Sequence, residues 1–326
     1  MPQAKPSRPA QQPPAAKRIS AFERAANELR QPTTAFPLVS PRWLLSAAAV
    51  AILAACCLGW GALCFLYWQG SWQLLYHPKT ETTRTPASVG LPFESIKFAV
   101  TETGTAQLTG WWLPAESSRF TVLYLHGADG NLSDSVDALA QLHRDHLSVF
   151  AIDYRGYGQS QPINEGGKPS EKHLRQDAEW GLTWLTLTHG VPAKSIVLWG
   201  TGLGATIAAE LAADHPELSG VVLDAPQQNA VSTILNDSRS RLVPAHWLVK
   251  DRYDLIEAVQ KMHVPTLWLL SQPPTGQPGT PPDAYQSAQV QKTMAWLTVP
   301  STQDPHFSES LQRWLDDLPG EKSQPR

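Results

Sequence analysis

The hydrophobic positions of this chain form one long run followed by many short ones. The long run, Trp43–Trp68, contains no charged residue, and a helix needs about 20 residues to cross the hydrocarbon layer of a membrane. Beyond it, short apolar runs alternate with segments in which apolar residues recur at helical spacing. The pattern therefore predicts a membrane helix followed by a domain that mixes strands and helices.

The short apolar runs predict eight strands. The central ones are apolar at nearly every position, which is typical of strands covered on both faces. Helical segments separate most of them, so we expect a mostly parallel sheet with an antiparallel start, where two strands follow each other directly. The expected strands are Ile96–Val100, Leu108–Trp112, Thr121–Leu125, Ser148–Ile152, Ile196–Trp199, Gly220–Leu223, Thr266–Leu270 and Ala295–Val299, and the expected helices are Ser133–Arg144, Ser170–Thr188, Gly204–Asp214, Asp254–Met262 and Pro305–Leu318.

The flanks of the long run predict its orientation. Aromatic residues, which favour the membrane interface, lie at both of its ends. Most of the nearby cationic residues precede it, so the positive-inside rule places the N-terminus in the cytoplasm and exports the C-terminal domain, to the periplasm if the source is bacterial. Leu53–Cys56 reads LAAC, like a lipoprotein cleavage box, but twelve uncharged residues follow it within the run. That continuation favours an uncleaved anchor in the lipid bilayer.

The two ends of the chain read as tails. Residues 1–42 hold eight prolines and seven Lys or Arg but few large apolar residues, so we expect a disordered basic tail, with a short helix near Ser20–Arg30 as the alternative. A proline-rich segment suits a groove on a protein partner. Residues 319–326 are expected to form a second disordered tail. The net charge of −3 shows no basic excess, which argues against nucleic-acid binding.

Four short motifs add a family resemblance. They are YLHGADGN (Tyr124–Asn131), DYRGYGQS (Asp153–Ser160), DRYD (Asp251–Asp254) and LLYHPK (Leu74–Lys79). Together they resemble membrane-anchored α/β-hydrolases of the serine-aminopeptidase and acylglycerol-lipase-like branch, over residues 72–318. The resemblance implies an α/β-hydrolase fold with a mostly parallel eight-stranded sheet, preceded by one transmembrane helix at residues 43–68.

A glycine stands at the nucleophile position of this resemblance. Hydrolases of the family carry their serine in a G-x-S-x-G turn between a strand and a helix. Here the frame reads Gly200-Thr201-Gly202-Leu203-Gly204, so Gly202 occupies the serine position. The backbone of that position is strained for any residue with a Cβ, and glycine carries little of the cost. Gly202 is thus the residue that the turn favours when no chemistry is required.

The resemblance also locates an oxyanion hole and an acid. The hole would use the backbone N–H groups of Ala128 and Leu203; alternatively, these loops only turn the chain. The acid position falls near Pro274, in a proline-rich loop without a carboxylate before Asp283. Asp224, at the end of a strand, is either a substitute acid or a hydrogen-bonded strand-end carboxylate.

The base position falls on His306, before the last helix. A catalytic histidine needs an orienting acid and a nucleophile, and neither is visible in the sequence, so His306 is either a base or a helix-entry residue. No metal or cofactor motif is present, and we expect neither. Residues Gln227–Lys250 interrupt the alternation and suggest a small cap, in which Trp247, Leu248 and Val249 line a pocket or form the core of the cap.

These features leave three hypotheses for function. The first is a catalytically impaired serine-hydrolase homologue that binds a small acyl or lipid ligand, or a protein. The second is an active hydrolase of ester or amide substrates with a non-standard site. The third is a structural component of a membrane complex. Whether the chain is an enzyme stays open at this point, because both the serine and the aspartate of the triad are missing from their expected positions.

Overall fold

The structure is a computed structural model, and it describes residues 20–28, 39–100, 106–161, 168–227, 230–273, 279–298 and 300–318. The chain divides into two compact units, Met1–Gly59 and Trp60–Arg326. Most of the N-terminal tail, the C-terminal tail from residue 319 and the Pro274 position lie outside the described residues.

The N-terminal unit contains α1 (Ala21–Glu28) and the first part of α2 (Pro41–Gly70). Helix α1 departs from the expectation of a wholly disordered tail, and its physical reason is a capping box. Ser20 Oγ accepts from the Glu23 N–H at 3.2 Å, and Glu23 Oε2 accepts from the Ser20 N–H at 3.3 Å. Helix α2 begins two residues before the expected span and ends two after it. Within the described residues it belongs to one segment long and apolar enough to cross a membrane, and none of its residues is buried.

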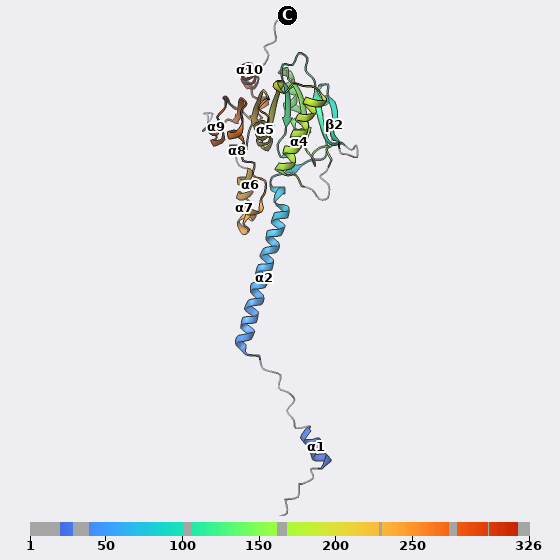
Figure 1. The fold of residues 1–326 in the computed structure, drawn as a ribbon, viewed down its shortest axis with the longest axis vertical. Helices are drawn as coiled ribbons and strands as arrows, with labels where there is room; N and C mark the ends of the chain where they lie inside the picture. Colours follow the sequence, from blue (N-terminus) through green and yellow to red (C-terminus); the bar gives the residue numbers. More distant parts are fainter. Residues whose placement is uncertain are drawn as a thin grey trace, which may run out of the picture. The chain divides into compact units, whose positions relative to one another are not determined.

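The second unit is built on an eight-stranded sheet in the order β10-β9-β8-β7-β4-β6-β3-β2 (Figure 1). All pairs from β10 to β6 are parallel, whereas β3 pairs antiparallel with both β2 and β6. The strands are β2 (Glu94–Val100), β3 (Ala106–Leu113), β4 (Thr121–Leu125), β6 (Ser148–Asp153), β7 (Ile196–Thr201), β8 (Gly220–Asp224), β9 (Thr266–Ser271) and β10 (Lys292–Leu297). The parallel sheet and its antiparallel start are confirmed. The last strand lies about three residues earlier than expected, because β10 pairs residue by residue with β9 from Lys292 opposite Thr266.

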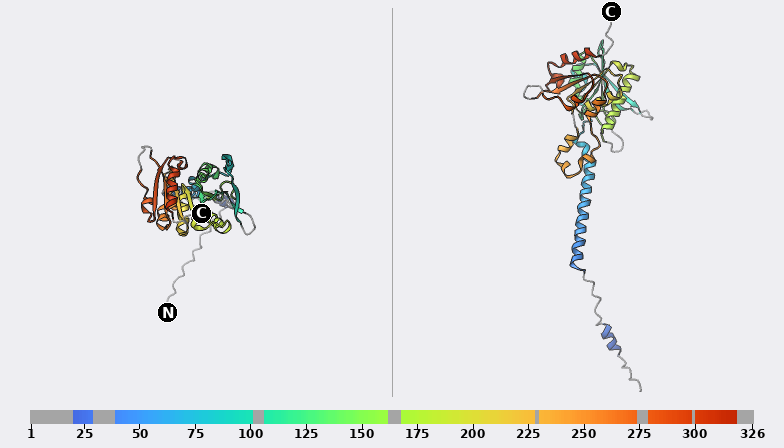
Figure 2. Two further views of the ribbon diagram at one scale, coloured as in Figure 1. Left: turned by 90° about the horizontal axis from the view of Figure 1, so that it is seen from above. Right: turned by 60° about the vertical axis from the view of Figure 1, so that its left-hand side comes forward.

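Helices cover both faces of the sheet (Figures 1 and 2). On one face, α3 (Val136–Arg144) and α10 (Phe307–Asp317) bury Leu139, Leu311 and Trp314 against the strands. On the other face lie α4 (Glu171–Thr183), α5 (Leu203–Asp214) and α8 (Leu255–Lys261), followed by α9 (Asp283–Ser287). The five expected helices are therefore present.

Shorter elements connect these layers. They are η1 (Ser71–Leu74), β1 (His77–Pro78), η2 (Pro86–Val89), β5 (Asp129–Gly130), η3 (Leu132–Ser135), the π-helical turn η4 (Trp184–Thr188), η5 (Ala193–Ser195) and η7 (Ser301–Gln303). Strand β1 pairs with β5, so the LLYHPK motif lies directly beside the YLHGADGN motif.

An insertion of short helices separates β8 from α8, as the break in the alternation predicts. It contains α6 (Ala230–Asn236), η6 (Ser238–Leu242) and α7 (Ala245–Leu248). The expectation for Trp247 is wrong: its side chain is 79% exposed, so it belongs neither to a cap core nor to a pocket wall. The reason is that α7 has only four residues and buries its opposite side through Ala245. Leu248 and Val249 do line a cavity, together with Trp68 and Trp72.

Candidate functional site

A sharp turn joins β7 to α5, as the sequence predicts. Strand β7 ends at Thr201 and α5 begins at Leu203, so Gly202 alone makes the turn, with φ +59° and ψ −118°. Its N–H donates to the carbonyl oxygen of Asp224 at 3.0 Å, which ties the turn to the end of β8. Side chains with a Cβ rarely adopt this backbone conformation, and glycine adopts it freely.

The two glycines that flank the turn are required by close packing. A Cβ on Gly200 would lie 2.2 Å from the Gly204 carbonyl oxygen, and a Cβ on Gly204 would lie 2.3 Å from the Leu125 carbonyl oxygen. At Gly202 itself the nearest atom to an added Cβ is the Gly127 Cα, at 3.9 Å. The turn thus keeps the tight flanks and the open centre of a turn that presents a side chain, but its central residue has none.

The His-Gly loop lies directly beside this turn. Strands β4 and β7 are neighbours, with Leu125 opposite Gly200, and a Cβ on Gly127 would lie 3.3 Å from the Thr201 carbonyl oxygen. The Ala128 carbonyl oxygen accepts from the His77 N–H at 3.0 Å and from Tyr157 Oη at 2.9 Å. The LLYHPK and DYRGYGQS motifs therefore fix the loop that carries the Ala128 amide.

The second predicted oxyanion donor is the amide of Leu203. It is the first residue of α5, and the first N–H groups of a helix have no partner within the helix. A helix N-terminus also favours negative charge. The two backbone donors thus lie on adjoining loops at the same edge of the sheet, as the sequence expectation requires, and their joint role as an oxyanion hole stays a prediction.

Asp224 lies at the same edge, at the end of β8. Its carboxylate is buried, and Ser301 Oγ donates to Asp224 Oδ1 at 2.7 Å. Burial raises the pKa of Asp224 to about 6, opposed by the hydrogen bond from Ser301. The sequence did not single out Ser301, although its place just after the last strand was a usable signal.

A cavity of about 210 Å³ opens between Asp224 and the start of α3. Several hydroxyl groups line it, including those of Tyr124, Ser135 and Thr201. The Thr201 hydroxyl donates to Tyr124 Oη at 3.3 Å, and Tyr124 Oη donates to Ser135 Oγ at 3.4 Å. This lining can hold a small ligand through hydrogen bonds.

His306 does not join this group. Its side chain is exposed where α10 begins, and it is not among the residues that line the Asp224 cavity. Asp304 accepts from the His306 backbone N–H at 2.8 Å and from the Thr298 N–H and hydroxyl, so these contacts do not orient the imidazole. The structure favours the helix-entry interpretation of His306. The acid position at Pro274 lies outside the described residues.

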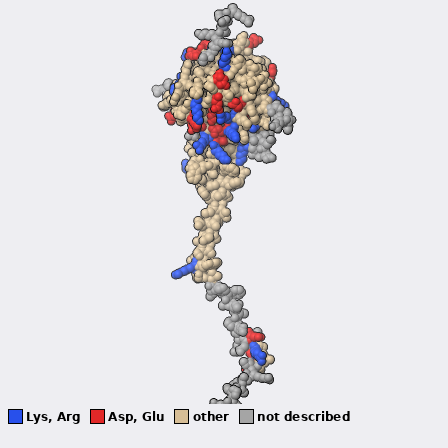
Figure 3. Space-filling view, in the orientation of Figure 1, with Lys and Arg blue, Asp and Glu red and all other residues tan. Residues whose placement is uncertain are grey.

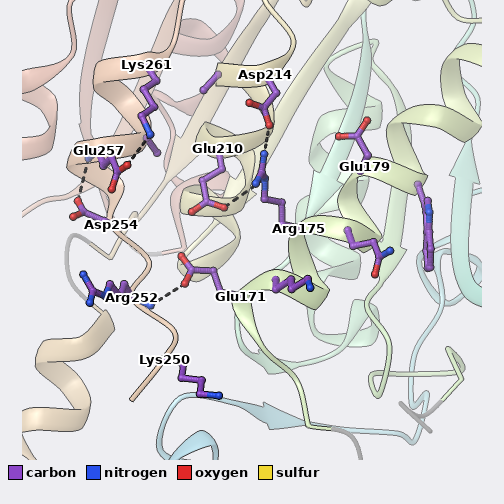
Figure 4. Close-up of a pocket in the computed structure, with 15 residues that line it drawn as sticks. Glu171, Arg175, Glu179, Glu210, Asp214, Lys250, Arg252, Asp254, Glu257 and Lys261 are labelled. Atoms are coloured by element: carbon purple, nitrogen blue, oxygen red, sulfur yellow. Dashed lines mark hydrogen bonds and ion pairs between the residues drawn. The ribbon is translucent and has the colours of Figure 1, made fainter. Parts of the chain in front are cut away.

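A second, larger pocket lies on the helical face formed by α4, α5 and α8. It measures about 780 Å³, and charges of both signs line it (Figures 3 and 4). Arg175 pairs with Glu210 and Asp214, and Lys261 pairs with Glu257. Glu171 accepts from the backbone N–H groups of Arg252 and Tyr253, both at 2.8 Å. Across the described residues, neither this pocket nor any other position gathers three side chains of the kind that hold a metal ion.

Comparisons with known proteins agree with this architecture. The family model described as alpha/beta hydrolase fold matches residues 121–317. An uncharacterized protein of Mycobacterium tuberculosis is 31% identical over 222 residues, which cover 68% of this chain and 73% of that protein. An uncharacterized membrane protein of Saccharomyces cerevisiae is 33% identical over 142 residues, or 43% of this chain and 48% of its own length.

Solved structures show the same fold at lower sequence identity. An esterase of Pyrococcus furiosus has a TM-score of 0.56 and 18% identity, and the match covers 74% of this chain and 97% of the esterase. An alpha-beta hydrolase from Vibrio vulnificus has a TM-score of 0.50 and 19% identity, over 71% of this chain and 81% of that one.

Proposed function

Because the chain belongs to the alpha/beta-hydrolase fold family, we propose that it is a membrane-anchored, catalytically impaired member of it. In this proposal the strand-end site binds an acyl or lipid ligand and does not cleave it. Alternatively, an impaired homologue of this kind binds a protein partner at the same site.

One observation supports the proposal most directly: the conformation of Gly202. Its φ of +59° and ψ of −118°, between the close-packed Gly200 and Gly204, retain the turn on which the family carries its nucleophile. Glycine supplies no oxygen at that point. Loss of the nucleophile alone lowers the turnover of a triad hydrolase by roughly a million-fold.

The remaining groups of the site suit binding. The amides of Ala128 and Leu203 could donate to a carbonyl or carboxylate oxygen, since backbone donors do not depend on the lost side chain. The cavity at Asp224, which the neighbouring residue Thr201 lines, offers further hydroxyl groups. We infer a ligand with an acyl oxygen, because such an oxygen accepts hydrogen bonds from two paired backbone amides.

The membrane anchor is supported by α2 and by the relative from yeast. Helix α2 lies within the described segment long and apolar enough to span a bilayer, and the yeast relative is named a membrane protein. The charge asymmetry around the span favours a cytoplasmic N-terminus and an exported domain. A reporter that is active only after export, fused after Arg326, would be silent if this orientation were wrong.

A fluorophosphonate probe tests the inactive site, because it labels only an activated serine. We expect no labelling of the wild-type chain and weak labelling of Gly202→Ser, since the acid is still absent. The double variant Gly202→Ser, Pro274→Asp should label no more strongly, because His306 is exposed and does not line the site, so the serine still lacks a base. Gly202→Ala is the matched control, because it adds the same Cβ without an oxygen.

The main alternative is an active hydrolase with a non-standard site. The buried hydrogen bond between Ser301 and Asp224 is the observation that favours it. Strong labelling of the wild-type chain that Ser301→Ala abolishes would establish this alternative and overturn our proposal.

A further inference from the structure

The insertion of α6, η6 and α7 lies against the last part of α2. Trp60 Nε1 donates to the Leu242 carbonyl oxygen at 3.1 Å. A cavity of about 240 Å³ lies between the two elements, lined by Leu63 and Tyr67 of α2 and by Val243 of the insertion. Figures 1 and 2 both show α6 and α7 beside this end of α2. The insertion is thus placed directly beside the proposed membrane span.

The insertion exposes unusually large apolar side chains. Leu235 is 40% exposed, Leu242 is 62% exposed and Trp247 is 79% exposed. Among the described residues beyond α2, only Val89 and Leu187 are comparably large, apolar and exposed. A concentration of exposed apolar surface in one short segment marks an interaction surface.

Cationic side chains accompany this apolar surface. Arg239 and Arg241 are both exposed, and Lys250 follows α7. Arg239 pairs with Asp237 at 2.8 Å, the single carboxylate among the described residues of the insertion. Aromatic and aliphatic side chains next to Arg and Lys are typical of segments that lie in the membrane interface.

Position along α2 indicates depth in the membrane. Trp60 lies eight residues before Trp68, which is about 12 Å of helix. This inference rests on the proposed membrane anchor. If α2 spans the membrane with Trp68 at the interface, Leu242 lies inside the hydrocarbon layer, at the level of Trp60. The hydrogen bond from Trp60 satisfies the Leu242 carbonyl at a depth where water cannot.

We propose that the insertion is a second membrane contact. Leu242 and Trp247 enter the leaflet nearest the domain, and the long side chains of Arg239 and Arg241 extend from the same segment toward the lipid phosphates. A lipid surface is favoured over a protein partner because the apolar surface continues directly from α2, whose surroundings in a membrane are lipid. The domain is then held at the bilayer at two points, and a flexible tether is excluded.

Site-specific fluorescence in liposomes tests this proposal. The full-length chain, with its three native cysteines replaced by alanine, receives one cysteine at a time as Leu242→Cys or Trp247→Cys. Leu187→Cys is the matched control, since Leu187 is 81% exposed. The first residues of α4 lie near Trp68, and Leu187 lies beyond the other end of that helix. Leu187 is therefore roughly 25 Å along the helix axis from the level of Trp68. A fourth variant retains Cys56 to report the anchor.

Each cysteine carries a polarity-sensitive dye, and each variant is reconstituted in vesicles of equal parts phosphatidylcholine and phosphatidylglycerol. Dyes at positions 242 and 247 should be quenched severalfold more by nitroxide-labelled lipid than the dye at 187, and severalfold less by aqueous iodide. Circular dichroism checks that each variant is folded.

Three other outcomes overturn the proposal in distinguishable ways. If dyes at 242 and 247 behave like the dye at 187 while the dye at Cys56 is quenched by lipid, the second contact is wrong and the anchor stands. If the dye at Cys56 is not quenched by lipid, the anchor itself fails. If dyes at 242 and 247 are protected from both quenchers, a protein covers this surface.

Discussion

The site at the carboxyl ends of the strands, around Gly202 and Asp224, differs from the charged pocket on α4, α5 and α8 in its backbone conformation and in its side chains. At the strand ends, the backbone has a special arrangement: a positive φ at Gly202, two glycines without room for a Cβ, and amides on adjoining loops. Reactive side chains are scarce there. In the charged pocket most of the lining residues lie on the helices α4, α5 and α8. Charged side chains are abundant there, and five of them form ion pairs with one another: Arg175, Glu210, Asp214, Glu257 and Lys261 (Figure 4).

This difference shows which observations indicate a site. The charged pocket is the larger cavity, yet its ion pairs have a structural role: Arg175 joins α4 to α5, and Glu257 pairs with Lys261 within α8. The strand-end cavity is small, but the turn beside it has a backbone conformation that glycine adopts freely and that is costly for any residue with a Cβ. A backbone conformation that disfavours a Cβ, next to backbone N–H donors, is therefore a better sign of a functional site than a concentration of charge.

The largest effect is expected from Gly204→Ala. The added Cβ would lie 2.3 Å from the Leu125 carbonyl oxygen and 2.4 Å from that of His126, so β4 and α5 must separate. We expect a loss of about 3 kcal/mol in the free energy of unfolding, measured by denaturant titration of the full-length chain in detergent. In the control, Gly181→Ala in α4, the closest atoms are the side-chain methyls of Ile152 and Leu123 at 3.3 Å, which can move.

An intermediate effect is expected from Gly202→Ala. Space is available for the methyl group, so the cost comes from the backbone conformation alone and should be about 1–3 kcal/mol. Gly70→Ala is the control, since its φ is −102° and no atom lies within 4 Å of the added carbon. Equal stability of wild type and Gly202→Ala would mean that the turn is not strained, and the contrast with the charged pocket would then disappear.

Near pH 5 the smallest effect is expected in the charged pocket, from Glu210→Gln. Burial, followed by the neighbouring Glu171, raises the pKa of Glu210 to about 8. A raised folded-state pKa gives stability that is complete below the unfolded value of about 4.5 and is lost as pH rises through the folded value. Relative to wild type, Glu210→Gln should therefore gain stability between about pH 5 and pH 8.

Thermal midpoints measured across this pH range check the Glu210 prediction. Glu257→Gln is the matched control, because Glu257 pairs with Lys261 at the exposed end of the same pocket. A pH-independent difference between Glu210→Gln and wild type would show that this carboxyl is not held protonated by its surroundings.

Much of the fold was predictable because local pattern and tertiary structure agree. Strands such as Thr121–Leu125 are mostly apolar and buried throughout, and the glycine frame at Gly200–Gly204 has a conformation that follows from its residues. The site was predictable only where the backbone defines it. The Asp224–Ser301 contact joins residues 77 positions apart: the place of Ser301 just after the last strand could be predicted from the sequence, but its pairing with Asp224 could not.

The exposure of Trp247 escaped the sequence for a different reason. An aromatic residue in a short apolar segment usually marks a core, and only the contact between Trp60 and Leu242 reveals that this segment lies beside α2. A local sequence pattern does not distinguish an apolar side chain that faces a protein core from one that faces water or lipid.

The strand order has a consequence for how the chain assembles during synthesis. From β7 onward each strand adds next to the one that preceded it, in the order β7, β8, β9 and β10. The ribosome synthesises these strands in the same order, so each new strand can pair with the exposed edge of the strand made before it. None of them has to insert between two strands that are already paired. The first half is different: β4 cannot complete both of its edges until β7 arrives, about 70 residues later. That interval is when the nascent chain is most exposed to aggregation, and a chaperone would protect it best there.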